Sequence, residues 1–106
     1  MNYLQDNIVS FYKALAHPTR LKILDVIKEH DEICVCNIND DLDLEQSNLS
    51  QHLKVLRNSG ILTTRRDGSK IMYSLTNKDI ITALNTISDI VTTQLEDQFH
   101  SIKKGD

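Results

Sequence analysis

The sequence predicts one mainly α-helical domain that carries a single β-hairpin, an α+β fold. Several stretches place apolar residues at helical spacing, as Leu49, Leu53 and Leu56 do. The period then changes to β-branched residues on either side of Asp67-Gly68, a strong two-residue hairpin signal. A chain of 106 residues has room for one domain with a modest core, so we treat 1–106 as a single domain.

The first half of the chain predicts three helices. Apolar spacing indicates the first over 4–15, and His17-Pro18 ends it. Pro18 suits the first turn of a second helix, which we expect to continue to about Glu29. A short third helix is expected over about 37–42.

The fourth predicted helix lies in the stretch from Leu44 to Arg57. We expect Asp43 to cap it, with Gln46 completing a variant of the capping box, and Gly60 to mark its end. With the third helix it makes a helix-turn-helix over about 37–59. Its exposed face carries amides and hydroxyls, which bond base edges in the DNA major groove, and ends in cations, which pair with phosphates. An ordinary solvated face is the alternative.

A basic hairpin follows over about 61–75. Arg65, Arg66 and Lys70 cluster around its tip. A stabilising hairpin with a charged, soluble end is the simpler interpretation. Directly after a helix-turn-helix, a wing that touches the phosphate backbone or minor groove is favoured.

Charge is distributed unevenly along the chain, although the net charge is only −3. Residues 46–76 carry five cations against one acid, whereas 1–45 carry four cations and nine acids. The basic segment coincides with the fourth helix and the hairpin. Local sign matters for phosphate contact more than total charge does.

The last predicted helix, over about 78–102, has an unusually long apolar stripe. Its members are Ile80, Leu84, Ile87, Val91, Leu95 and Phe99. One small core does not need a stripe of this length. The stripe either packs on the helix at 4–15 within the same chain or, as we favour, joins that helix in forming the interface of a homodimer. A dimer would place the fourth helix of each copy, the helix expected to read bases, on successive major-groove turns.

The expected DNA contacts divide into two groups. The side chains expected to meet bases or nearby phosphates are Gln46, Ser47, Asn48, Ser50, Gln51 and His52. Those expected to meet phosphates are Lys54, Arg57, Arg65, Arg66 and Lys70.

Several function classes find no support in the sequence. No apolar run is long enough to span a membrane, and the N-terminus shows no signal peptide, so we expect a cytoplasmic protein. The three glycines form no phosphate-binding loop. Cys34 and Cys36 lie too close in sequence to be the framework of a secreted disulfide fold.

These elements, in this order and at this length, resemble the ArsR/SmtB family of winged-helix repressors. The motifs that carry the resemblance are KALAHPTRLKIL at 13–24, ICVC at 33–36, QSNLSQHLKVL at 46–56 and GSKIMYSL at 68–75. They cover almost the whole chain. The resemblance implies a winged helix-turn-helix homodimer that represses transcription, releases operator DNA when an inducer binds, and is not an enzyme.

The resemblance also implies an inducer site. Cys34 and Cys36 match the thiolate site at the start of the third helix, which binds arsenite, antimonite or soft divalent ions such as cadmium. Arsenic sensors often carry a further cysteine where this chain has Asn39. The zinc site on the last helix of other members is expected to be absent. Asp79 is kept, but the other ligand positions hold Ile81, Thr92 and Leu95.

The chemistry of the two cysteines leaves alternatives open. Two thiols separated by one residue lie about 200° apart around an ideal helix, so joint chelation needs an extended or distorted backbone, as at a helix start. A helix N-terminus would also favour the thiolate, and soft thiolates select soft ions. His17 and His30 are possible further donors, although each is more simply a helix-end residue.

Three interpretations of the cysteine pair compete. A metalloid or soft-metal sensor, with As(III), Sb(III) or a soft divalent ion as inducer and no required cofactor, is preferred. A redox or reactive-sulfur sensor is second, because a close thiol pair can form a disulfide or polysulfide. Small buried residues without a sensing role are the third. Rivals from other classes are a small thiol–disulfide oxidoreductase, which would want a sheet-based redox fold, and a protein-interaction module.

Overall fold

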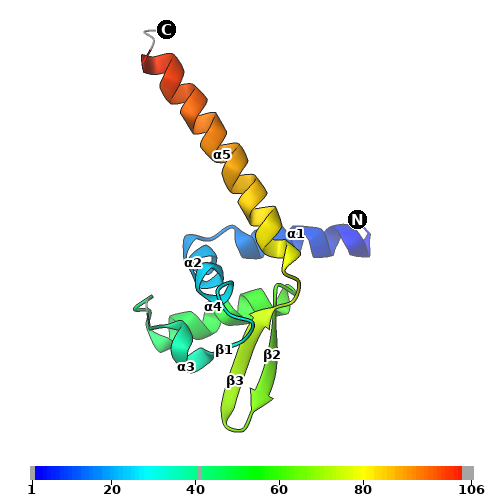
Figure 1. The fold of residues 1–106 in the computed structure, drawn as a ribbon. Coiled ribbons are helices and arrows are strands. Elements are labelled where there is room, and N and C mark those ends of the chain that lie inside the picture. Colours follow the sequence, from blue (N-terminus) through cyan, green and yellow to red (C-terminus); the bar gives the residue numbers. More distant parts are fainter. Residues whose placement is uncertain (1, 41, 104–106) are drawn as a thin grey trace.

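Helices fill the first half of the chain, and a hairpin and a long helix follow (Figure 1). The computed structural model describes residues 2–40 and 42–103. In chain order the elements are α1 (Tyr3–Leu15), α2 (Pro18–Ile27), β1 (Ile33–Cys34), α3 (Val35–Ile38), α4 (Gln46–Asn58), β2 (Leu62–Asp67), β3 (Lys70–Leu75) and α5 (Asp79–Lys103). The predicted fold class, mainly helical with one hairpin, is confirmed.

One hydrophobic core joins the helices to the sheet. Leu49, Leu53 and Leu56 of α4 are each no more than 1% exposed, so the predicted apolar stripe is buried. The remaining buried members are Ala14, Ile23, Leu24, Ile27, Ile33, Ile38, Ile61, Leu62 and Ile80. These residues come from every element except β3, so burial of α4 depends on the rest of the domain.

The start of α2 follows the sequence prediction, and its end comes sooner. Pro18 occupies the first turn, where its missing N–H costs no hydrogen bond. His17 is the N-cap, and its Nδ1 accepts a hydrogen bond of 3.0 Å from the backbone N–H of Thr19. The helix ends at Ile27 rather than near Glu29.

The segment around the cysteines forms a strand that the sequence analysis missed. β1 pairs antiparallel with β3, so the sheet has the order β1-β3-β2. α3 then begins directly at Val35, and it is a single turn that ends at Ile38 rather than a helix over 37–42. Apolar Ile33 and Cys34 are buried because they add to the free edge of the hairpin before the chain turns into α3.

The predicted cap of α4 is wrong. Asp43 has a φ of +53°, and the N-cap is Glu45, whose side chain makes no capping hydrogen bond. The connection from α3 is fixed by Asn39, which accepts from the Leu44 N–H at 2.9 Å and donates to the Leu44 carbonyl at 2.6 Å. This turn holds Asp43 before the N-cap position and Gln46 at the first helical position.

The predicted end of α4 is confirmed. Gly60 has a φ of +87°, a left-handed conformation that favours glycine. Its N–H bonds to the Arg57 carbonyl, and the Ile61 N–H bonds to the Leu56 carbonyl. This is the Schellman arrangement of helix ends, and it turns the chain so that Ile61 enters the core.

The hairpin has the predicted strands but a turn displaced by one residue. Asp67 pairs with Lys70, so Gly68 and Ser69 form the two-residue loop rather than Asp67-Gly68. Gly68 carries the positive φ, +62°, at the first loop position, as type II′ turns require. The hairpin projects beyond the layer of helices (Figure 1).

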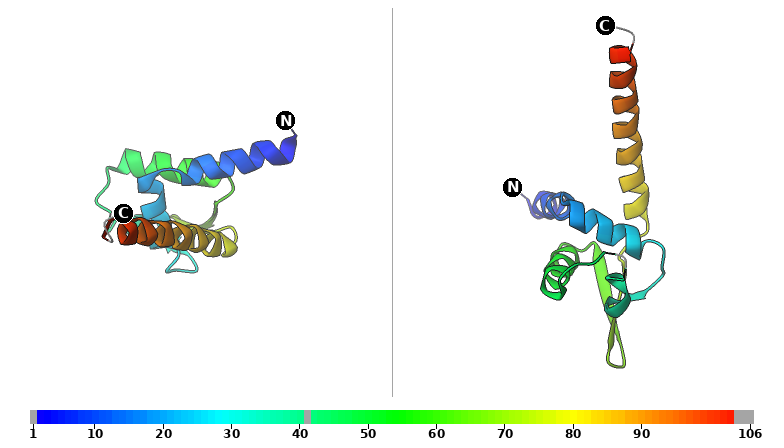
Figure 2. Two further views of the ribbon diagram at one scale, coloured as in Figure 1. Left: turned by 90° about the horizontal axis from the view of Figure 1, so that it is seen from above. Right: turned by 90° about the vertical axis from the view of Figure 1, so that its left-hand side faces the viewer.

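The helix α5 extends as an arm away from the rest of the domain, on the side opposite the hairpin (Figure 2). Only the beginning of its apolar stripe meets the core: Ile80 is buried and Leu84 is half-buried. Ile87 and Leu95 farther along are 50% and 58% exposed. The chain's own core therefore does not account for the length of the stripe.

Candidate DNA-binding surface and thiol site

The polar face of α4 is open to solvent over most of its length. Its exposed side chains are Gln46, Ser47, Asn48, Ser50, Gln51, Lys54 and Arg57. The opposite face holds the buried leucine stripe, and α4 packs against β2 of the hairpin. Amides, hydroxyls and two cations are thereby presented on one face of a helix whose back is fixed to the core.

His52 is placed differently from the other residues predicted to contact bases. It is half-buried, and its ring lies 4.6 Å from that of His17, between ring centroids. The Arg20 guanidinium lies 3.5 Å from its Nδ1, and Arg20 is itself held by the Ala14 carbonyl, which accepts from its Nε at 2.6 Å. Burial first, then the charges of His17 and Arg20, lower the pKa of His52. Its ring therefore ties α4 to the start of α2.

The two arginines of the hairpin also differ. Arg65 donates two hydrogen bonds of 2.8 Å to the carboxylate of Glu32, just before β1. The hydrogen bond from Arg65 is the main reason that the pKa of Glu32 is lowered. Arg66 and Lys70 are exposed, and neither takes part in an ion pair within the described part of the chain. Arg66 and Lys70 are thus the freer cations of the hairpin.

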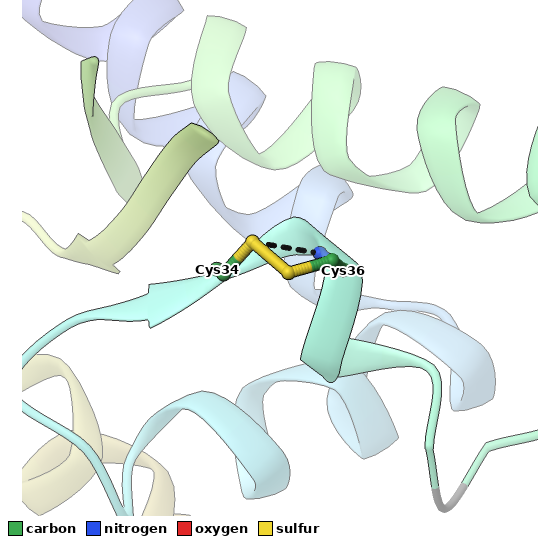
Figure 3. Close-up of a disulfide and its surroundings, with 2 residues drawn as sticks. All are labelled: Cys34 and Cys36. Atoms are coloured by element: carbon green, nitrogen blue, oxygen red, sulfur yellow. Dashed lines mark hydrogen bonds between the residues drawn. A yellow bond between two sulfur atoms is a disulfide. The ribbon is translucent and has the colours of Figure 1, made fainter. Parts of the chain in front are cut away.

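The two cysteines lie at the junction of β1 and α3, where the structure joins them in a disulfide (Figure 3). Cys34 has extended backbone and caps α3, so the sulfurs are not held on opposite sides of a regular helix. Its Sγ accepts the Cys36 N–H at 3.2 Å, and the two Cα atoms are 5.1 Å apart. Cys34 is 5% exposed, whereas Cys36 is exposed.

Of the two histidines named as possible further donors, His30 shares a groove with Cys34, whereas His17 caps α2. His17 is occupied as the N-cap of α2, and Asn39, at the position of a third cysteine in arsenic sensors, is occupied by Leu44. His30 lines an open groove of about 640 Å³ together with Cys34. Among residues 2–40 and 42–103, no three His, Cys, Asp or Glu side chains are arranged to hold a metal ion.

Sequence reasoning missed Glu32, Arg20 and His17 as partners of the predicted DNA-contacting side chains. Glu32 and Arg65 are 33 positions apart, and Arg20 and His52 are 32 apart. Such contacts follow from the fold and have no local pattern. The sequence offered only complementary residue types as a signal. Glu32 is an acid that can pair with an arginine of the hairpin, and Arg20 is a cation that can contact a histidine.

Among the described residues, no helix has both the length and the apolar character that a membrane crossing requires.

The sheet has three short strands and is flanked by helices, which differs from the sheet-based redox fold expected of a thiol–disulfide oxidoreductase.

Comparisons with known sequences agree with this architecture. Residues 17–64 match the model of the family described as bacterial regulatory protein, arsR family. An HTH-type transcriptional regulator of Mycobacterium tuberculosis, Rv0081, is 40% identical over 83% of this chain and 77% of its own length. The arsenical resistance operon repressor of Staphylococcus xylosus is 37% identical, covering 76% of each chain.

Solved structures extend the likeness to three dimensions. The crystal structure of Rv0081 covers 92% of this chain and 98% of its own, with a TM-score of 0.80 and 36% identity. The homodimeric winged helix-turn-helix DNA-binding domain Mb0332 of Mycobacterium bovis has a TM-score of 0.78 and 26% identity, covering 89% and 86% of the two chains. α3, α4 and the hairpin correspond to a winged helix-turn-helix, and the chain belongs to the ArsR family of DNA-binding transcriptional regulators, which are not enzymes.

Proposed function

We propose that this chain is a homodimeric repressor that binds operator DNA through α4 and the hairpin and releases it when an inducer acts on Cys34 and Cys36. The observation that carries the proposal is the position of the two sulfurs. They meet at the β1–α3 junction, immediately before the turn that leads into α4. A regulator of this family acts on DNA in the cytoplasm.

The DNA contacts follow from exposure and charge. We assign base or nearby phosphate contacts to Gln46, Ser47, Asn48, Ser50 and Gln51, with His52 at the inner edge of the same face. Lys54, Arg57, Arg66 and Lys70 supply phosphate contacts, and Arg65 joins them by exchanging Glu32 for a phosphate.

Dimerisation is assigned to α1 and α5. An apolar groove of about 360 Å³ lies between them, and exposed apolar side chains continue from it along both helices. A second copy of the chain would cover this surface and fix the separation of the two α4 helices. The homodimeric Mb0332 domain supports this assignment.

A soft metal ion or metalloid is the first candidate inducer. In the reduced protein both sulfurs become available, and the extended backbone at Cys34 lets them face one ion. Soft thiolate ligands select soft ions over magnesium or calcium. The similarity to the arsenical resistance operon repressor of S. xylosus supports an arsenical such as arsenite as one class of inducer. α3 is a single turn, so its dipole adds little to thiolate formation.

Oxidation is the second candidate, and a specific observation favours it. Cys34 and Cys36 are joined in a disulfide, so the pair can exist in an oxidised and a reduced form. Under either candidate, the change at the β1–α3 junction is transmitted to α4 and the hairpin. To move the protein from about 1:99 to 99:1 in favour of the DNA-released state, the inducer must favour that state by about 5.5 kcal/mol.

Fluorescence anisotropy with labelled DNA from the gene's own promoter tests the proposal. The reduced protein–DNA complex is titrated with arsenite, antimonite, cadmium, zinc, copper(I) and polysulfide. The measurement is repeated with Cys34→Ser and Cys36→Ser. Asn37→Ser, on the exposed side of the same turn, is the matched control.

We expect at least one inducer to release DNA from the wild type and from the Asn37 variant, but not from either cysteine variant. Release that survives both cysteine substitutions removes these residues from the mechanism. Failure to bind any promoter fragment refutes the repressor proposal and favours a protein-interaction module.

A further inference from the structure

Three side chains form a row across the middle of the sheet. Met72 of β3 is the direct partner of Cys34 in β1, and on its other side it is the partner of Arg65 in β2. Directly paired residues of antiparallel strands point to the same face, with Cβ atoms about 4.5–5.5 Å apart. The side chain of Met72 therefore lies beside that of Cys34.

This spacing suits two ligands of one ion. Metal–sulfur bonds of about 2.3 Å place the sulfurs of a three-coordinate centre about 4 Å apart. The direct pairing of Cys34 with Met72 brings their Cβ atoms close enough for the flexible Met72 side chain to place its sulfur at that separation. Both residues line the groove of about 640 Å³, and Met72 is only half-buried.

The charge of the groove indicates which inducer it takes. Glu32, Asp40 and Asp67 line it together with the ammonium of Lys70, and the Arg65 guanidinium pairs with Glu32, so one acid is in excess. This balance attracts a cation more than neutral arsenous acid. A thioether also cannot form the third covalent bond to arsenic that a thiolate forms, whereas thiolates and thioethers together select copper(I).

We propose that Met72 completes a three-sulfur site with Cys34 and Cys36 that binds copper(I). The inference rests on the proposed function, since it names the ligand class of the same thiol site. His30 lines the groove as well, but it is not part of any three-residue His, Cys, Asp or Glu set among the described residues.

Loading the site requires the reduced form. A phosphine reductant transfers two electrons to the Cys34–Cys36 disulfide. Water supplies the two protons of the thiols and the oxygen of the phosphine oxide. Copper(I) then replaces the two thiol protons, and the thioether of Met72 adds without losing a proton. The ion joins the β1–α3 junction to β3, so it acts on the hairpin as well as on the turn before α4.

Competition with a chromophoric copper(I) chelator under anaerobic conditions tests the assignment on the reduced full chain. Met72→Leu keeps the volume and removes the sulfur. Ile71→Leu, the next residue of β3 and on the opposite face, is the control. We expect Met72→Leu to weaken copper(I) binding by at least about tenfold and Ile71→Leu to leave it unchanged. Copper X-ray absorption should count one sulfur fewer in Met72→Leu.

The outcomes separate this inference from the proposed function. Wild-type copper(I) affinity in Met72→Leu, with binding still lost in Cys34→Ser, overturns the role of Met72 alone. Wild-type affinity in Cys34→Ser overturns the copper(I) site as a whole, whereas the proposed function fails only if DNA release by every inducer survives both cysteine substitutions. Circular dichroism and the DNA affinity of metal-free Met72→Leu should match those of the wild type.

A gain-of-function variant gives a second test that does not depend on loss of folding. Met72→Cys places a third thiolate beside Cys34 and Cys36 and should raise arsenite affinity by at least about tenfold. An unchanged arsenite affinity would mean that the side chain at position 72 does not reach the two cysteines.

Discussion

Arg65 and Glu32 form a two-pronged ion pair, with both N–O distances at 2.8 Å, that ties β2 of the hairpin to the residue just before β1. The neighbouring Arg66 makes no such pair within the described residues. Arg65 must therefore break an ion pair before it can contact DNA, whereas Arg66 need not. A sequence-based prediction treats the two arginines alike.

Arg66→Ala should weaken DNA binding and flatten its salt dependence. Loss of one phosphate contact reduces the slope of log affinity against log salt by about 1. Arg65→Ala should change the slope less, because Arg65 must first leave Glu32. Anisotropy titrations over a series of salt concentrations measure both slopes.

Glu32→Gln provides the complementary measurement, because it removes the carboxylate that competes with phosphate for Arg65. It should raise DNA affinity at low salt. Lys78→Ala removes a cation that lies just before α5 and pairs with Asp31; it is the control and should leave the slope unchanged. Equal slope changes in the Arg65 and Arg66 variants, with no effect of Glu32→Gln, would contradict the competition.

The contact of His52 with His17 and Arg20 predicts a pH-dependent stability. The pKa of His52 in the native protein is lowered from 6.5, so the unfolded chain binds a proton first as pH falls. The stabilisation from the neutral ring is complete above about pH 6.5. It is lost as pH decreases from there toward the native pKa. Urea unfolding at a series of pH values measures this dependence.

His52→Gln should remove part of that pH dependence, since glutamine does not titrate. His100→Gln, an exposed histidine near the end of α5, is the matched control and should leave this pH dependence as in the wild type. A pH profile unaltered by His52→Gln would assign the titration to another group.

Leu95→Glu should dissociate the dimer. Burying a leucine stabilises an interface by about 1.5–3 kcal/mol, and a twofold dimer contains the residue twice. A dissociation constant raised at least about 100-fold follows from a loss of about 3 kcal/mol. Thr93→Glu introduces the same charge away from the apolar stripe and should leave the dimer intact. Sedimentation equilibrium distinguishes the two, and dimers of equal strength in both would argue against α5 as the interface.

The sequence sufficed for features that depend on local periodicity and special backbone conformations. The α4 stripe, Pro18 at the start of α2 and Gly60 at the end of α4 were all predictable, because each is determined by neighbours within one or two turns. The exposed polar face of α4 followed from the same pattern.

Features that depend on distant partners were not predictable. β1 exists because β3 offers it a pairing edge, and two residues carry no strand pattern of their own. The Asp43 cap failed because Asn39, through its two bonds to Leu44, sets where α4 begins. The predicted surface was identified correctly as polar and exposed, but the pairing of Arg65 with Glu32 and the inward position of His52 required the fold.

The missing side-chain cap of α4 gives a prediction that distinguishes the observed start of the helix from the predicted one. Glu45 is the N-cap and makes no side-chain hydrogen bond, whereas the shorter aspartate is among the preferred capping residues. Glu45→Asp keeps the charge and should raise the free energy of unfolding by about 0.5–1 kcal/mol. Urea denaturation measures the gain. Glu29→Asp, an exposed position beyond the end of α2, should give none. If Asp43 were the cap instead, Glu45→Asp would also leave stability unchanged.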